Sequence, residues 1–252
     1  GSVRFSSRKA IKESLTGRLI AWELLPLGLS EIYSQDMPKG VLRLAQSRHV
    51  NLDIKAQPYF SHKSFLEYLY CGGLPGIFAI RDTGIREQKI ETQLNTMLER
   101  DLKLILQTTV PYRSLRLLLA TLAKSQGMPV EWAALSRQSR ISVPTVKKLV
   151  GAFEAMFLIR LLSTRGTETK TVVFLEDQGE ASFLMEGQRQ ELYDLLRFCF
   201  ANLRTQLSYQ TVVQSTFFQY RNRGGAHIPL AVELRTKETK HYLGIVPILG
   251  TT

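Results

Sequence analysis

Cysteine is scarce in this sequence of 252 residues. Its two cysteines, Cys71 and Cys199, lie far apart, and neither forms a Cys-x-x-Cys or Cys/His pair with ligand spacing. The four histidines show no such spacing either; they are His49, His62, His227 and His241. Zinc sites need closely spaced cysteine and histidine ligands, and disulfide frameworks need several cysteine pairs. We therefore expect no metal site, no disulfide framework and a reducing, cytoplasmic setting.

Long apolar runs are also missing. The sequence has no apolar stretch of about 18 residues, the length that suggests a membrane-crossing helix. Its first residues, GSVRFSSRKAIKESL, contain no apolar segment of signal-peptide length. They also lack an initiator methionine, which indicates that Gly1 and Ser2 are either a cloning scar or the interior of a longer protein. We expect no membrane partner.

Acidic residues are fewer than basic ones. Lysine and arginine total 33 against 22 aspartates and glutamates, which leaves a formal net charge of +11. Such an excess favours polyanionic partners, of which nucleic acid is the commonest. Charge also governs solubility and association rate without any specific anionic partner, so this alternative stays open.

A phosphate-binding loop is absent as well. The sequence contains no Gly-x-x-x-x-Gly-Lys-Ser/Thr motif, whose backbone N–H groups and lysine hold nucleotide phosphates. VVFLED at 172–177 looks like the apolar strand whose terminal acid holds Mg²⁺ in an ATPase, but this chain offers it no such loop. We expect the chain alone to bind no ATP or other cofactor and to hydrolyse no ATP.

Helical periodicity is present in the first half of the sequence. Four segments carry apolar residues at helical spacing: 8–22, 61–70, 86–106 and 113–127. Ser61 or Ser64 is suited to cap the second of these helices. The stretch 34–60 is polar and irregular, which predicts a long connection. CGGLPG at 71–76 predicts a sharp turn, because glycine adopts positive φ readily.

The segment 111–175 predicts a winged helix. Its first helix is followed by a short helix in VEWAALSRQSR, a turn at ISV and a further helix in PTVKKLVGAFEAM. FLIRLL and TVVFLE then flank a polar loop, as the two strands of a ribbon do. Helix, helix, turn, helix and ribbon is the order of a winged helix. Pro144 fits because its missing N–H falls in the first helical turn.

The surface predicted for this module is basic. Four apolar residues of its last helix share a face that can point to the core: Val146, Leu149, Val150 and Phe153. Seven residues are candidates to contact phosphates: Arg137, Arg140, Thr145, Lys147, Lys148, Arg165 and Lys170. The last helix has no Asn, Gln or Arg cluster for reading base edges, so we expect binding largely without sequence specificity. A winged helix can equally dock a protein, and that alternative stays open.

The last third of the sequence mixes helix and strand. A helix at 191–207 precedes three β-rich stretches, TVVQSTFFQYR, AHIPLAVELR and HYLGIVPIL, so the predicted fold class is α+β. A metal-dependent nuclease would need an Asp on one strand and acid-x-Lys on the next. The nearest match is Glu233-Leu234-Arg235, and no Asp precedes it in the hairpin. Arginine cannot deprotonate as lysine can, so a working nuclease is disfavoured.

Four short motifs occur in a characteristic order: GSVRFSS (1–7), ESLTGRLIAWELLPLGLSE (13–31), FLEYLYCGGLPG (65–76) and LERD (98–101). They are similar to a sensor-strand end, a Ser-Leu-x-Gly-Arg helix with a Pro-Leu-x-x-x-Glu segment, a Gly-Gly-x-Pro turn and a Glu-Arg-Asp helix. In this order they resemble a large family of bacterial and archaeal AAA+ ATPase-like proteins with a C-terminal domain of unknown function. The resemblance covers nearly the whole chain.

The resemblance implies four parts. These are a remnant of the ATPase core at 1–32, a helical linker region at 33–110, the winged helix at 111–175 and a restriction-endonuclease-like α/β module at 176–252. The chain would then be the C-terminal portion of a larger ATPase, in which Arg18 contacts a nucleotide phosphate. ATP and Mg²⁺ are implied only for such a parent protein.

The last module departs from the family at its acids. The family's Glu-Val-Asp and Ile-Glu-Val-Lys motifs align with His227-Ile228-Pro229 and Ile245-Val246-Pro247-Ile248, or the second with Glu233-Leu234-Arg235. Asp194 matches the acid of the family's Leu-Phe-Glu helix. We therefore expect a degenerate module with Asp194 and Glu233 as remnant acids. The resulting hypothesis is nucleic-acid binding without enzyme activity in isolation; a protein-interaction or homo-oligomeric module and a metal-dependent nuclease are the alternatives.

Overall fold

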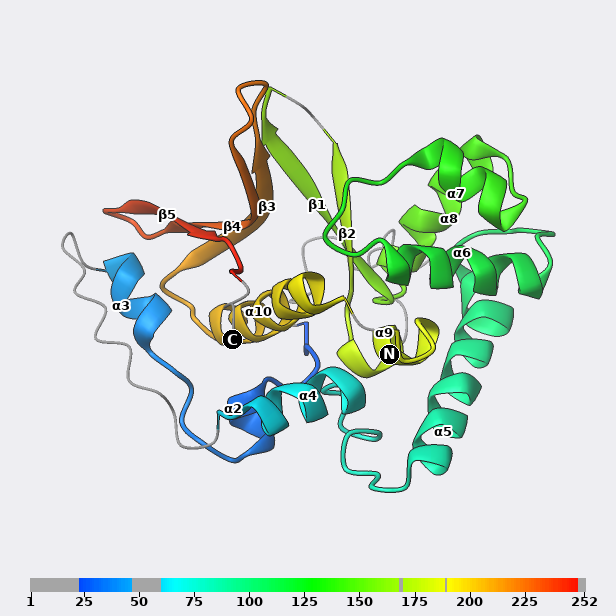
Figure 1. The fold of residues 1–252 in the computed structure, drawn as a ribbon, viewed down its shortest axis with the longest axis horizontal. Coiled ribbons are helices and arrows are strands. Elements are labelled where there is room, and N and C mark those ends of the chain that lie inside the picture. Colours follow the sequence, from blue (N-terminus) through cyan, green and yellow to red (C-terminus); the bar gives the residue numbers. More distant parts are fainter. Residues whose placement is uncertain (1–22, 47–59, 168–169, 189, 249–252) are drawn as a thin grey trace, which may run out of the picture.

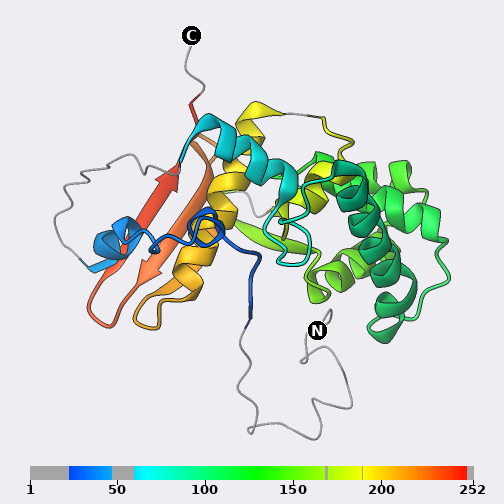
Figure 2. The same cartoon turned by 90° about the horizontal axis from the view of Figure 1, so that it is seen from below.

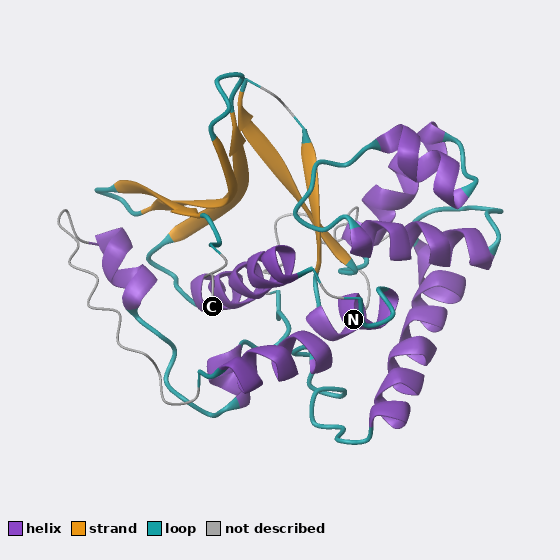
Figure 3. Cartoon of the chain, in the orientation of Figure 1, coloured by secondary structure: helices purple, strands orange, loops and turns teal. Residues whose placement is uncertain are grey.

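The computed structural model describes residues 23–46, 60–167, 170–188 and 190–248. Within these ranges the chain is α+β, with nine α-helices, α2 to α10, and a five-stranded mixed sheet (Figures 1 and 3). None of the helices in these ranges has both the length and the apolarity needed to cross a membrane. The predicted helix at 8–22 lies outside the described residues.

Three helices form the first part of the described chain: α2 (Leu29–Ile32), α3 (Gly40–Gln46) and α4 (His62–Cys71). The stretch 34–60 was predicted to be irregular, and α3 shows that this is wrong for 40–46. The sequence gives little sign of α3 because its stability comes from distant contacts, with Val41 and Leu42 packed against the last strands of the sheet. Residues 47–59 lie outside the described part.

The predicted start of α4 is confirmed by a reciprocal cap. Ser61 Oγ accepts a hydrogen bond from Ser64 N at 3.1 Å, and Ser64 Oγ accepts one from Ser61 N at 2.8 Å. Each serine satisfies a backbone N–H that the first helical turn leaves without a partner. The glycine turn that follows is also confirmed, because Gly72 ends the helix with a φ of 72°.

The helix predicted at 86–106 begins as α5 (Thr83–Thr96) and does not continue as one regular helix. It widens into a π-helical turn at Met97–Asp101 and ends in a 3₁₀ turn at Leu102–Leu104. The wide turn keeps Met97 and Leu102 in the same core as the α5 residues. An apolar stripe predicts burial along a helix, but it does not show where the hydrogen-bond pattern changes.

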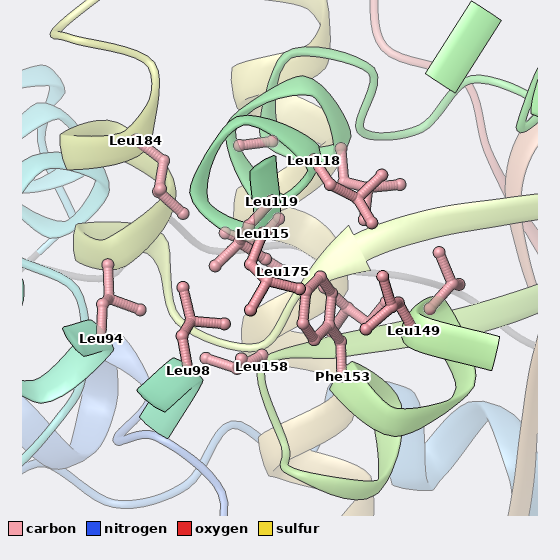
Figure 4. Packing of buried hydrophobic residues seen from close by; sticks show 14 of the residues in the cluster. Leu94, Leu98, Leu115, Leu118, Leu119, Leu149, Phe153, Leu158, Leu175 and Leu184 are labelled. Atoms are coloured by element: carbon pink, nitrogen blue, oxygen red, sulfur yellow. The ribbon is translucent and has the colours of Figure 1, made fainter. Parts of the chain in front are cut away.

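The next three helices are α6 (Tyr112–Lys124), α7 (Trp132–Ser139) and α8 (Val143–Ala155), followed by β1 (Ile159–Gly166) and β2 (Thr171–Leu175). A bridge between Pro129 and Val172 joins the α6–α7 connection to the edge of β2. Leucines of α6, α8 and β2 meet in the largest apolar core, in which Leu118, Leu149 and Leu175 are labelled in Figure 4.

Strands from the C-terminal part of the chain extend the sheet, and they join it at β1. Its strand order is β2-β1-β3-β4-β5, with β3 (Gln214–Arg221), β4 (His227–Arg235) and β5 (Lys240–Ile245). β1 and β3 pair in parallel, and the other neighbours are antiparallel. One sheet therefore spans the boundary predicted at 175/176. Parallel strands need a long connection, here the segment that contains α9 and α10. The sequence pattern of the β1–β2 hairpin therefore did not predict that β1 pairs with β3.

One face of this sheet is covered by α10 (Glu191–Ser208), with α3 against β5 (Figure 2). Phe200 of α10 stacks on Phe174 of β2, with ring centroids 4.6 Å apart. The opposite face of β3, β4 and β5 carries Thr216, Glu233 and Tyr242 in register. This polar face is where the predicted remnant acid Glu233 lies.

A helix that was not predicted, α9 (Gln178–Leu184), follows β2 directly. Asp177 caps it by accepting from Glu180 N at 2.9 Å, and the other carboxylate oxygen accepts from Gly73 N at 2.7 Å. A Cβ on Gly72 would lie 2.3 Å from Asp177 Oδ1, so this close approach requires glycine. Asp177, the last acid of VVFLED, therefore connects the glycine turn to the start of α9; this contact is called the joint below.

Candidate nucleic-acid interface

The basic surface begins at the turn between α7 and α8. Arg140 ends α7 with a φ of 58°, in the left-handed region. Ser142 directly precedes α8, and its Oγ lies 2.9 Å from Thr145 Oγ1, while Pro144 occupies the first turn as predicted. Only residues 140–142 separate the two helices, which holds them in contact with each other.

Packing decides which side chains of α8 reach solvent. The four apolar residues predicted to face the core are at most 1% exposed: Val146, Leu149, Val150 and Phe153. Figure 4 shows Leu149 and Phe153 pointing into the cluster that contains Leu158. Lys147 and Lys148 are exposed, because the apolar stripe assigns them to the opposite side of the helix.

Four cations of this region, here called the α7–α8 cations, are Arg137, Arg140, Lys147 and Lys148. All four are exposed, and within the described residues none of them forms an ion pair. Lys147 Nζ lies 5.6 Å from the centroid of the Trp132 ring, a cation–π contact that leaves its charge uncompensated. The positive charge of a cation without an acidic partner remains available to attract an anion from solution.

The β1–β2 tip, here the described residues 165–167 and 170, contains the two remaining predicted cations. Arg165 Nη1 lies 2.6 Å from Glu233 Oε2, and its guanidinium carbon lies 4.1 Å from the centroid of the Phe218 ring. Lys170 Nζ lies 3.8 Å from Glu131 Oε1. Both cations are half-exposed and both have an acidic neighbour, so their charge is less available than that of the α7–α8 cations.

Arg160, which adds to the basic surplus of the segment, belongs to an internal network. Its Nε donates to Glu176 Oε1 at 3.0 Å, and Arg204 Nη2 donates to Glu23 Oε1 at 2.7 Å. Two further ion pairs, Arg160 with Glu23 and Arg204 with Glu176, close the network. It joins β1, α10 and the segment that enters α2, so its role is structural.

Two arginines that the sequence analysis did not select lie beside the β1–β2 tip. Arg221 is the last residue of β3, and Arg223 lies in the turn between β3 and β4, where its N donates to Thr167 Oγ1 at 2.7 Å. The available signal was the stretch RNRGGAH, in which arginines flank a glycine turn.

Asp194 is held in a buried ion pair. Its Oδ1 accepts from Arg197 Nη2 at 2.6 Å, and the two side chains are 1% and 3% exposed. The pair lies within α10, where Arg197 follows one helical turn later. A carboxylate in this position stabilises the helix and its contacts with the body of the protein.

Glu233 is surrounded by three cations. They are Arg165 at 2.6 Å, Arg235 at 3.3 Å and Lys240 at 3.4 Å. The hydrogen bond from Arg165, followed by the charge of Lys240, holds the pKa of Glu233 below its usual value. Among the described residues, no three His, Cys, Asp or Glu side chains form a group that could hold a metal ion. The chemistry at Glu233 is ion pairing.

The acids at the start of α9 are buried. Burial, and then the charge of Asp177, raises the pKa of Glu180 to about 8. Burial also raises the pKa of Asp177, although four backbone N–H groups act in the opposite direction. Glu180 Oε1 accepts from Gln93 Nε2 at 2.9 Å. This cluster connects α9 to α5 and to the glycine turn.

Residues 62–171 match the model of a family described as a domain of unknown function (DUF8612). The match runs from the first residue of α4 to the first residue of β2 and covers less than half of the chain. No curated protein and no solved structure matches the chain. The matched segment contains the α7–α8 cations. Arg18, predicted to contact a nucleotide, lies outside the described residues.

Proposed function

We propose that this chain binds nucleic acid through the α7–α8 cations and the β1–β2 tip, largely without sequence specificity. The observation that carries the proposal is the set of four exposed cations on one helix pair, none of them in an ion pair within the described residues. Such cations gain free energy by displacing counterions from phosphates. The net charge of +11 also favours association with a polyanion.

The order of the elements supports a winged-helix reading of this region. α6, the bridge at Pro129, α7, α8 and the β1–β2 ribbon follow one another in the order that such modules have. In that reading α8 is the helix that enters a groove, and Lys147 and Lys148 lie on its exposed side. α8 carries no Asn, Gln or Arg, so contacts to phosphates outweigh contacts to base edges.

The resemblance to AAA+ ATPase-like proteins suggests a setting for this binding. In a longer parent protein, an ATPase core with ATP and Mg²⁺ would precede the segment that ends at Glu23. Glu23 is bonded to Arg204 and paired with Arg160 of β1, so this segment is tied to the same strand that carries Arg165. Binding by the basic surface and nucleotide state would then be coupled through β1.

The test is fluorescence anisotropy with a labelled duplex and a labelled single strand, from about 0.05 to 0.2 M salt. The variant Lys147→Ala/Lys148→Ala removes two of the α7–α8 cations. We expect weaker binding and a log Kd against log salt slope that is flatter by about one unit for each lost phosphate contact.

The matched control is Lys63→Ala/Lys89→Ala. These two exposed lysines lie on α4 and α5, outside the α7–α8 helix pair, and their replacement removes the same amount of charge. Equal weakening by both double variants would mean that binding follows net charge alone. Absence of any binding at the lowest salt would contradict the proposal.

One observation favours the alternative of a protein-interaction or homo-oligomeric module. β5 lies at the edge of the sheet, and three exposed apolar side chains occur on or just after it: Tyr242, Val246 and Ile248. An edge strand of this kind can pair with another chain. Sedimentation of the chain with and without Tyr242→Lys separates the cases, since a dimer formed through β5 would dissociate.

A further inference from the structure

The β3–β4 turn and the β1–β2 tip are joined into a single element. Thr167 N donates to Arg221 O at 3.1 Å, and Arg223 N donates to Thr167 Oγ1 at 2.7 Å. Parallel pairing of β1 with β3 brings the two tips to the same end of the sheet, at the top of Figure 1. Here we call residues 165–167 and 221–226 the paired tips.

Glycine at position 166 permits this contact. Gly166 has a φ of 114°, and a Cβ there would lie 2.0 Å from Arg221 O. Any other residue would have to move the two tips apart, because both the backbone angle and the space exclude a side chain. The paired tips are therefore held by the strands and not by a flexible connection.

Two cations of the paired tips, Arg221 and Arg223, have no acidic partner in the described part of the chain, whereas Arg165 is paired with Glu233. Within the described residues, Arg221 and Arg223 form no ion pair, and Arg223 is exposed. Across 163–171 and 219–228 the sequence has four cations against one acid, Glu168. Burial, and then the charge of Arg221, lowers the pKa of His227 on the opposite strand. Both effects favour the neutral form of His227.

The side chain of Asn222 helps to close the β3–β4 turn. Asn222 Oδ1 accepts from Ala226 N at 2.9 Å, and Asn222 N donates to Ala226 O at 3.0 Å. The carbonyl oxygen of the Asn222 side chain is thus occupied in closing the turn, so this acceptor does not face an anionic ligand and the guanidinium groups supply the charged donors. A guanidinium presents its donors in a fork that matches two phosphate oxygens.

We propose that Arg221 and Arg223 form a second phosphate-binding element, so that the nucleic acid contacts the paired tips as well as α8. The ligand chemistry is the phosphodiester backbone, of a duplex or of a single strand. This inference rests on the proposed function and extends it to the C-terminal part of the chain, which lies outside the matched family segment.

The test compares three double variants with the wild type in the anisotropy titration. Arg221→Ala/Arg223→Ala should flatten the salt slope by about two units and weaken binding by about tenfold per lost contact at roughly 0.1 M salt. Arg221→Lys/Arg223→Lys keeps the charge and should keep the salt slope, while binding less tightly than the wild type because lysine lacks the fork of donors. Lys63→Ala/Lys89→Ala should have a clearly smaller effect. Thermal unfolding of each variant checks that the fold is kept.

The outcomes separate this inference from the proposed function. If the arginine-to-alanine variant binds like the wild type while Lys147→Ala/Lys148→Ala is weakened, the second element is wrong and the function stands. If Lys63→Ala/Lys89→Ala is weakened equally, the effect is one of net charge and the element is again wrong. If the wild type binds neither probe at low salt, both proposals fail. Parallel titrations show whether the element holds a duplex or a single strand.

Discussion

Arg165 Nη1 lies 2.6 Å from Glu233 Oε2, an ion pair that reaches from β1 to β4 across β3. Sequence reasoning assigned Arg165 to a nucleic-acid surface and Glu233 to the remnant of a metal site. In the structure Arg165 binds Glu233 and not a phosphate. The carboxylate of Glu233 in turn binds cationic side chains and not a metal ion. The consequences for binding and for metal chemistry can be tested separately.

Glu233→Gln is expected to strengthen nucleic-acid binding. Loss of the carboxylate frees Arg165, Arg235 and Lys240 from their shared partner. One additional phosphate contact would steepen the salt slope by about 0.9 and raise affinity by up to about tenfold at roughly 0.1 M salt. The anisotropy titration measures this, and an unchanged slope would show that Arg165 does not face the ligand.

Asp194→Ala is expected to lower stability, and neither the variant nor the wild type is expected to cleave nucleic acid. Removal of one partner from a buried ion pair leaves the charge of Arg197 uncompensated, which costs about 3–5 kcal/mol. Denaturant unfolding measures this loss, and Asp194→Ala/Arg197→Leu should recover part of it. Mg²⁺-dependent cleavage by the wild type that a folded Asp194→Ala variant lacks would restore the nuclease alternative.

The buried acid Glu180 should make stability depend on pH. Its pKa is about 8 in the folded chain, above the ordinary value of 4.5 expected after unfolding. Between these values the folded state holds a proton that the unfolded state has lost, so stability falls as pH rises through this window. Its contribution changes by at most about 1.4 kcal/mol per pH unit and levels off above the folded pKa.

The variant Glu180→Gln isolates this contribution, since glutamine can still accept the hydrogen bond from Gln93. We expect the stability of the variant relative to the wild type to increase from about pH 5 to about pH 8. Denaturant unfolding at several pH values measures the difference. The exposed acid Glu91, changed to Gln on α5, serves as the control. A difference that does not vary with pH would mean that Glu180 is ionised in the fold.

Gly72→Ala should disrupt the joint between the glycine turn and α9. The new Cβ would lie 2.3 Å from Asp177 Oδ1 at a backbone φ of 72°, which should cost at least about 2 kcal/mol. Gly151→Ala is the matched control. Gly151 is an exposed residue of α8, and apart from its own helix turn no atom lies within 4 Å of the new Cβ. That change should stabilise the helix by about 0.5–1 kcal/mol. Thermal unfolding compares the two.

Local features of the fold could be predicted where the cause lies within a few residues. The cap at Ser61 needs only Ser64, the turn at Gly72 needs only a residue that accepts positive φ, and the core face of α8 follows from helical spacing. Each of these predictions is confirmed because neighbouring residues determine the structure.

Features that depend on distant residues could not be predicted in the same way. Arg165 and Glu233 are 68 positions apart in the sequence, and Asp177 reaches Gly73 over 104 positions. The acids of VVFLED look hydrophilic, yet Asp177 is 1% exposed because the glycine turn provides N–H groups for it. Sequence patterns identify the groups that need partners, and the tertiary fold decides which partners they find.

The network around Glu23 also has a mechanical consequence. Glu23 is held by Arg160 at the start of β1 and by Arg204 on α10, so a pull on the chain at Glu23 reaches a strand and a helix at once. β1 runs from Ile159 to Gly166, and Thr167, the residue after it, is bonded to Arg221 at the end of β3. β1 therefore connects the ion-pair network at Glu23 directly to the paired tips at the far end of the sheet.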